Sequence, residues 1–142
     1  FTVGHEDGTF SAAATTPGGG SAALRKQLGF LKRVFDRQNL AAMRPADGVV
    51  SHARCLGQEG QSYLCYAHYG ELRSQFRPLY AVETAKKSVT WRAMLPAGQY
   101  QAVWWEPRSG RDLARTEIQS NGSAELKTPK HSEDIALELL RK

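Results

Sequence analysis

The order of the predicted elements constrains the fold of this chain most strongly. An amphipathic helical pattern covers residues 22–38, and short apolar runs bounded by turn residues follow it from residue 49 to residue 140. A helix that precedes all the strands argues against a parallel α/β sheet. Short strands separated by Gly, Pro and Asn turns at intervals of about ten residues are typical of an antiparallel sandwich or barrel. We therefore predict a mainly β fold: an antiparallel β-sandwich, immunoglobulin-like or jelly-roll-like, preceded by one amphipathic α-helix and a disordered N-terminal loop.

The predicted helix combines an apolar stripe with a basic opposite face. Ser21 stands where an N-cap is expected, and Leu24, Leu28, Leu31 and Phe35 recur at spacings of three and four residues. The same segment carries five cations: Arg25, Lys26, Lys32, Arg33 and Arg37. They contribute much of the formal net charge of +5, and no nucleic-acid-binding motif accompanies them. We interpret this face as solvated or partner-facing and expect no nucleic-acid binding. We also expect no membrane binding, because no apolar run approaches the roughly 20 residues of a membrane-spanning helix.

Eight strands are predicted after the MRP sequence that ends at Pro45, where the residue before proline is pushed out of helical geometry. The turns between them contain GQEG, PAG, RSG and NG. The predicted strands are Val49–Leu56, Ser62–Tyr69, Leu79–Thr84, Ser88–Met94, Gln99–Trp105, Arg111–Ile118, Glu125–Lys127 and Ile135–Leu140.

The two cysteines flank the predicted GQEG turn. If Gly57 to Gly60 close the hairpin, Cys55 lies opposite Ser62, and Cys65 falls three positions further on and points to the other face. A register one residue away still leaves the pair diagonal, at about 7 Å, which is too far for the sulfur atoms to join comfortably. We therefore predict two buried thiols and no disulfide.

No complete set of catalytic residues occurs in the sequence. Hydrolysis of a glycosidic bond ordinarily uses two carboxylates roughly 5 to 9.5 Å apart, whereas Glu6 and Asp7 are adjacent and diverge on an extended loop. There is no G-x-S-x-G nucleophile elbow and no phosphate-binding loop. The four histidines lie on separate predicted elements without the spacing of metal ligands: His5, His52, His68 and His131. We expect no catalytic residue, no metal site and no cofactor in this chain.

The three tryptophans are candidates for carbohydrate binding. Trp91, Trp104 and Trp105 lie on two strands joined through the PAG turn, and an exposed indole can stack on a sugar ring. Because Trp104 and Trp105 are consecutive, one faces the core and the other faces the opposite side of the sheet. The alternation of side chains along the strand does not by itself decide which of the two faces the core. Either the outer ring is exposed and binds carbohydrate, or it is covered by the helix or by another domain.

Several stretches of the sequence resemble a known family. The segments FTVGHEDGTF, PGGG, LRKQLGFLKRVFDRQN and AAMRPADGVV resemble the region that leaves the last strand of apiosidase-like TIM-barrel proteins in the glycoside hydrolase superfamily. The segments SYLCYAHYG, VTWRAMLPAGQYQAVWWEPRSGR and DIALELLRK resemble the small β-domain that follows such barrels, which carries the label of a collagen-binding domain of a collagenase. The most specific element is LPAGQYQAVWWEPRSG.

The resemblance implies a division of the chain into three parts. Residues 1–20 would be a loop remnant of the barrel, residues 21–40 its terminal helix, and residues 45–142 a β-sandwich accessory domain. The partners it implies are the N-terminal TIM-barrel domain of the same parent chain and a polysaccharide, in a secreted or periplasmic location. This chain would not be an enzyme by itself, whereas the parent would be a glycoside hydrolase.

The resemblance also places three polar residues at the mouth of the barrel. Loops that follow barrel strands build the active sites of this fold, so His5, Glu6 and Asp7 are candidates for contact with sugar. The other interpretation is that GHEDG is only a turn-forming loop.

Two functions follow, and the exposure of the aromatic residues separates them. The favoured one is a non-catalytic accessory domain that packs on the catalytic barrel and assists polysaccharide binding. The alternative is an independent carbohydrate- or collagen-binding module that uses exposed aromatics. A flat exposed pair among the tryptophans and Tyr63, Tyr66 and Tyr69 would favour the binding module. A buried cluster beside a bare apolar helix face would favour docking on the barrel.

Overall fold

The structure, a computed structural model, describes residues 22–72 and 80–142 and shows a mainly β chain with one leading helix. The predicted fold class is confirmed. His5, Glu6, Asp7 and the predicted loop of residues 1–20 lie outside the described residues. The elements are α1 (Ala22–Phe35), β1 (Arg44–Pro45), β2 (Arg54–Gln58), β3 (Ser62–His68), β4 (Gly70–Leu72), β5 (Tyr80–Val82), β6 (Thr90–Ala93), β7 (Gly98–Glu106), β8 (Arg111–Ser120), β9 (Ala124–Lys127) and β10 (Asp134–Arg141).

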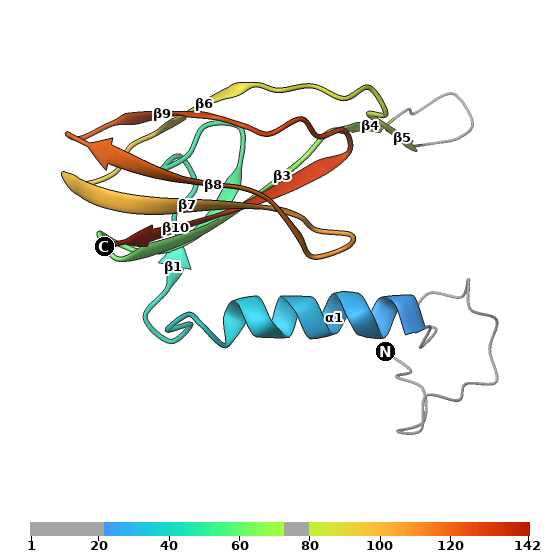
Figure 1. The fold of residues 1–142 in the computed structure, drawn as a ribbon, viewed down its shortest axis with the longest axis horizontal. Coiled ribbons are helices and arrows are strands. Elements are labelled where there is room, and N and C mark those ends of the chain that lie inside the picture. Colours follow the sequence, from blue (N-terminus) through green and yellow to red (C-terminus); the bar gives the residue numbers. More distant parts are fainter. Residues whose placement is uncertain (1–21, 73–79) are drawn as a thin grey trace.

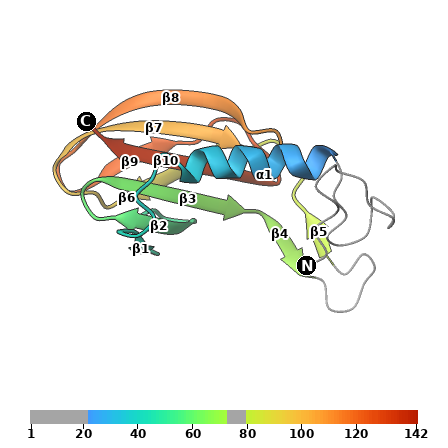
Figure 2. The ribbon, with the colours of Figure 1, turned by 90° about the horizontal axis from the view of Figure 1, so that it is seen from below.

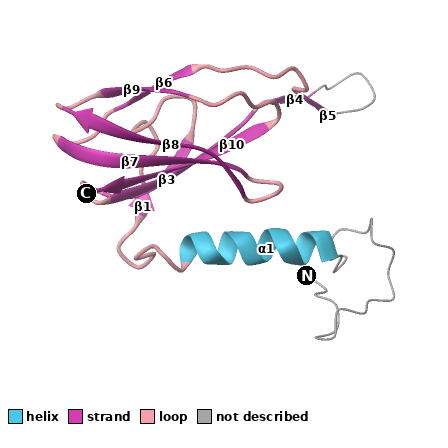
Figure 3. Cartoon of the chain, in the orientation of Figure 1, coloured by secondary structure: helices cyan, strands magenta, loops and turns pink. Residues whose placement is uncertain are grey.

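The described elements form three layers (Figures 1 and 3). The central layer is a six-stranded antiparallel sheet with the order β1-β2-β3-β10-β7-β8. The antiparallel pair β6–β9 covers one face, which we call the inner face, and α1 runs along the opposite, outer face. A third pair, β4–β5, extends one end of the sandwich.

The main core lies between the central sheet and the β6–β9 pair. Strand alternation supplies it, because every second residue of β3, β7 and β10 points to the inner face. Trp91 of β6 and Leu126 of β9 meet them from the other layer. The inward residues of the central sheet include Cys55, Tyr63, Cys65, Ala67, Tyr100, Ala102, Trp104, Ile135, Leu137 and Leu139.

The prediction of free thiols is wrong, because Cys55 and Cys65 form a disulfide. The turn of the β2–β3 hairpin consists of residues 59–61, so that Gln58 pairs with Ser62 and the two cysteines lie directly opposite each other. Gly60 adopts a φ of +69°, as expected for the left-handed position of a three-residue hairpin loop. The Cα atoms of the cysteines are 4.1 Å apart. The prediction failed because it assigned the wrong residues to the turn; both side chains are buried, as expected.

The observed strand boundaries differ most from the predicted ones before the first hairpin. The predicted strand Val49–Leu56 begins only at Arg54, because the chain turns at Gly48 and His52, whose φ angles are +95° and +63°. Val50 instead forms an isolated bridge with Ala93 of β6. The two- and three-residue strands β1 and β4 were not predicted, since so few residues carry no periodic pattern.

Candidate functional site

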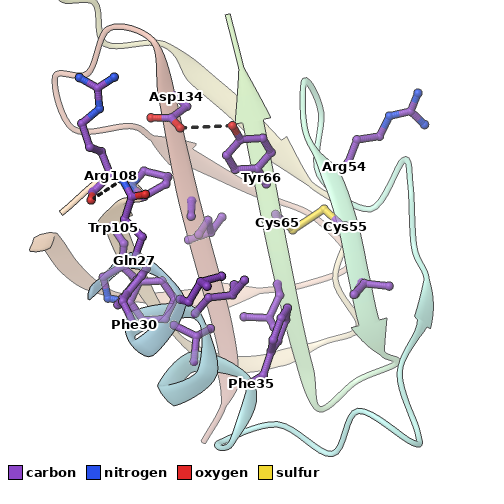
Figure 4. Close-up of a pocket in the computed structure, with 18 of the residues that line it drawn as sticks. Gln27, Phe30, Phe35, Arg54, Cys55, Cys65, Tyr66, Trp105, Arg108 and Asp134 are labelled. Atoms are coloured by element: carbon purple, nitrogen blue, oxygen red, sulfur yellow. Dashed lines mark hydrogen bonds between the residues drawn. A yellow bond between two sulfur atoms is a disulfide. The ribbon is translucent and has the colours of Figure 1, made fainter. Parts of the chain in front are cut away.

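An apolar groove of about 720 Å³ lies between α1 and the outer face of the central sheet (Figure 4). The predicted apolar stripe of the helix lines it from one side. Leu56 of β2 and Leu64 and Tyr66 of β3 line it from the other, and Trp105 and Ala136 form its base beside α1. The helix contributes Leu24, Leu28, Leu31, Val34 and Phe35.

Both walls of the groove leave large apolar side chains exposed. Leu28 and Leu31 of the helix are 51% and 44% exposed, and Leu56 and Tyr66 of the sheet are 39% and 42% exposed. Within the described part of the chain, six large hydrophobic side chains are exposed, and these four all line the groove. Contiguous apolar surface of this kind marks contact sites for other macromolecules or ligands. The groove is therefore the candidate functional site.

The middle of α1 is fixed to the sheet by an aromatic contact and a hydrogen bond. The rings of Phe30 and Trp105 meet edge to face, with centroids 5.8 Å apart. The Gln27 side chain donates a hydrogen bond of 3.2 Å to the carbonyl oxygen of Arg108. Gly110 lies against Phe30 so closely that a Cβ atom there would be 2.6 Å from the ring. Packing at this point holds the helix as one wall of the groove.

The chain just after α1 is fixed by a buried carboxylate. Glu138 of β10 is 2% exposed and lies on the outer face between Leu64 and Val103. It accepts a hydrogen bond of 2.5 Å from the Gln38 amide and lies 3.5 Å from the Arg37 guanidinium. Burial raises the pKa of Glu138 above its ordinary value, and the positive charge of Arg37 opposes this shift.

The structure separates the three tryptophans predicted to bind carbohydrate. Trp91 and Trp104 pack together in the main core, with ring centroids 5.0 Å apart. Trp105 points to the outer face, where Phe30 covers it, the Arg37 guanidinium lies 5.2 Å from its ring centroid, and its Nε1 donates to Asp112. All three are buried, with at most 3% of each side chain exposed. Carbohydrate binding by these residues stays a prediction, and for Trp105 it would require α1 to move.

Polar groups gather at the end of the groove near the start of α1. The Tyr66 hydroxyl donates a hydrogen bond of 3.2 Å to the Asp134 carboxylate. Glu133 lies 3.9 Å from His68 and 3.7 Å from Arg108. Burial, helped by the Asp134 charge, raises the pKa of Tyr66 to about 12, and burial also raises the pKa of Asp134. The groove thus has an apolar body and a polar mouth.

The described residues hold no group of three or more His, Cys, Asp and Glu side chains that could bind a metal ion. His52, His68 and His131 remain on separate elements. In the same part of the chain, no helix is long and apolar enough to cross a bilayer.

Sequence reasoning did not identify Glu138 or the polar mouth as parts of the site. The signal for Glu138 was present, because it is the one acidic residue in the otherwise apolar run IALELL. Its neighbours across the sheet, Leu64 and Val103, became known only with the strand pairing. The polar mouth joins residues from three distant segments, so no local sequence pattern predicts it.

Comparison with solved structures finds proteins that share this fold. The chain is similar to a protein titled "Glycoside hydrolase", with a TM-score of 0.55, 12% identity, and coverage of 90% of this chain and 26% of that one. It is also similar to a glycoside hydrolase family 5 protein from Bacteroides vulgatus, with a TM-score of 0.57, 12% identity, and coverage of 89% and 25%. No protein-family profile and no curated protein matches the chain.

At this level of identity the likeness shows a shared fold. The chain spans about a quarter of the length of the hydrolase chains that it matches. The matched region is therefore one part of larger proteins.

Proposed function

We propose that this chain is a non-catalytic accessory β-sandwich domain of a glycoside hydrolase and that it packs against the catalytic barrel of that enzyme. The observation that carries the proposal is the apolar groove, because both of its walls expose large apolar side chains. Covering these walls with a second domain would stabilise both domains by removing apolar surface from water. The choice of partner is supported by the hydrolase chains, of which about three quarters lies outside the match.

On this proposal the division of the chain follows the resemblance to apiosidase-like proteins. Residues 45–142 are the accessory domain, and residues 21–40 are the last helix of the barrel. A barrel helix that also packs on the sandwich through Phe30 would join the two domains rigidly. His5, Glu6 and Asp7 would then lie in the loop at the barrel mouth, where they could contact polysaccharide.

The disulfide supports a secreted or periplasmic location. Disulfides form and persist in oxidising compartments and are rare in the cytosol. The bridge between Cys55 and Cys65 closes the hairpin that supplies the sheet wall of the groove. Export would therefore help to maintain the proposed docking surface.

The independent binding module has less support from the geometry. Of the six aromatic residues named for it, only Tyr66 is exposed, and its hydroxyl is bonded to Asp134. The tryptophans are buried, and the exposed part of the apolar stripe on α1 faces the groove. This combination favours docking on a barrel over stacking on a glycan.

The first experiment compares the purified 142-residue chain with the complete product of its gene. Both are incubated with pectic, xylan and apiose-containing polysaccharides, and the released sugar is measured. We expect release only by the complete product. Release by the 142-residue chain would refute the non-catalytic role, and a gene that encodes no barrel before Phe1 would refute the accessory role.

A second experiment tests the supporting role. Deletion of residues 45–142 from the complete product should lower its melting temperature, because the apolar contact surface of the barrel becomes exposed. A control substitution, Asn121→Ser, changes only the exposed turn between β8 and β9. A barrel that is equally stable and active without the sandwich would contradict packing as the function.

A further inference from the structure

The outer face of the central sheet is only partly covered by α1. The helix contacts the region of β7 and β10, where Phe30 and Val34 pack with Trp105. The next strands in the sheet are β3 and β2, and their outer residues Tyr66 and Leu56 are exposed. Seen from the helix side, β2 and β3 lie beside α1 and are not beneath it (Figure 2). An uncovered strip, apolar except for the Arg54–Asp47 ion pair at its edge, thus runs alongside the helix.

The strip has the width of one helix. Neighbouring strands are about 4.8 Å apart, so β3 and β2 together carry the sheet about 10 Å beyond the strand that lies under α1. The axes of packed helices are about 8 to 10 Å apart. A helix that lay over β2 and β3 would therefore contact the sheet with one side and α1 with another. Leu28 and Leu31 would meet it from α1, and Leu56 and Tyr66 would meet it from the sheet.

We propose that the groove receives one amphipathic helix of the catalytic barrel, which lies beside α1 over β2 and β3. This inference rests on the proposed function and specifies its contact. The (β/α)₈ barrel is surrounded by a ring of helices, and the hydrolase chains that share this fold have about three quarters of their length outside the match. The occupant is therefore another segment of the same protein.

A second copy of this chain fits the groove less well. In the part of the chain that the structure describes, α1 is the only helix that a second copy could offer. Phe30 and Val34 of this helix already pack on its own sheet, and the residues after it are bonded to Glu138. Its exposed large apolar side chains are only Leu28 and Leu31, which already line the groove of their own chain.

The test uses a photoreactive phenylalanine derivative placed singly in the complete product of the gene. Positions 31 and 56 probe the two walls of the groove. Met94 and Glu125 are matched controls, because both are exposed, neither lines the groove, and both lie outside residues 21–40, which the proposed function assigns to the barrel. We expect both wall positions to cross-link to one segment of the barrel, at residues spaced by three or four. We expect no links to that segment from the controls.

Charge substitutions then test whether the two walls act together. Leu31→Glu should abolish the cross-link from position 56, and Leu56→Glu should abolish the cross-link from position 31. Glu125→Lys and Met94→Glu should leave both cross-links unchanged. The melting temperature of each isolated variant checks its folding, and the cross-linking result stands without the variants if one of them does not fold.

The outcomes separate this inference from the proposed function. Links from the two walls to different segments, links spaced by two residues as in a strand, or links to a second copy would overturn the helix proposal. Links to the barrel from the control positions alone would also overturn it, while leaving the accessory role intact. If no position links to the barrel, both proposals are wrong.

Discussion

Reduction of the disulfide should measurably weaken the fold. The bridge joins residues that are 10 apart in sequence, and the loop-entropy relation gives about 2.7 kcal/mol of stabilisation at 25 °C for a loop of this size. With a urea m-value of about 1.5 kcal/mol per M, the unfolding midpoint should fall by about 1.8 M when the protein is reduced. Reduction of the wild-type chain isolates this effect better than substitution, because Cys55 and Cys65 are buried and smaller residues would also leave cavities.

The assay is urea unfolding followed by tryptophan fluorescence, with and without reductant. The Cys55→Ala/Cys65→Ala chain is the control, since reductant should not change its midpoint. Alkylation of the unfolded wild-type protein without reductant should label neither cysteine. Equal midpoints for the oxidised and reduced wild-type chains, or two labelled cysteines, would refute the argument for the bridge and remove its support for export.

Two further predictions concern the docking of α1. Gly110→Ala should destabilise the chain by more than the cost of a left-handed alanine, about 1 to 2 kcal/mol, because its φ is +70° and the added Cβ would meet the Phe30 ring. Gly60→Ala is the control, since its φ is +69° and the nearest atoms to its added Cβ would lie at ordinary contact distances of 3.5 and 3.9 Å; equal losses in urea unfolding would contradict the contact with Phe30. Glu138→Gln should stabilise the chain more at pH 7 than at pH 4. Burial raises the pKa of Glu138, so the folded state binds the proton more tightly and this residue's contribution falls as pH rises from about 4.3 through the raised pKa. An amide still accepts the bond from Gln38 and does not titrate; a stability difference that is equal at both pH values would contradict the argument.

The location of α1 changes how the basic helix face is interpreted. The apolar stripe of the helix lines the groove, and Lys26 and Arg33 are exposed. Lys32 is paired with Asp36, and Arg37 lies over Trp105 and near Glu138. Part of the positive charge therefore serves the packing of the helix, whereas sequence reasoning treated all of it as a surface property.

Local patterns were sufficient to predict the helix and most of the strands but not how the strands pair. The apolar repeat of Leu24, Leu28, Leu31 and Phe35 predicted both the helix and the stripe that lines the groove. The strand predicted at Ile135–Leu140 is present as β10. These predictions succeeded because the direction of a side chain on a helix or strand is set by the local backbone.

The β2–β3 hairpin shows where that reasoning stops. The predicted turn, Gly57 to Gly60, and the observed turn, residues 59–61, differ by only a few positions. This small difference changes the cross-strand partner of Cys55 from Ser62 to Cys65. Register is decided by the turn geometry together with the burial of one face, and both depend on residues that pack from other strands. The disulfide could therefore not be predicted from the sequence pattern.

The sequence by itself determined that a helix with an apolar stripe precedes an antiparallel β-sandwich, because periodicity and turn residues act over a few neighbouring positions. Only the tertiary structure decided that Trp104 enters the core while Trp105 lies under α1, and that the stripe faces the uncovered strands β2 and β3. The groove joins segments from residue 24 to residue 137. Such a site depends on long-range packing, because which surfaces become buried depends on how all the elements pack together.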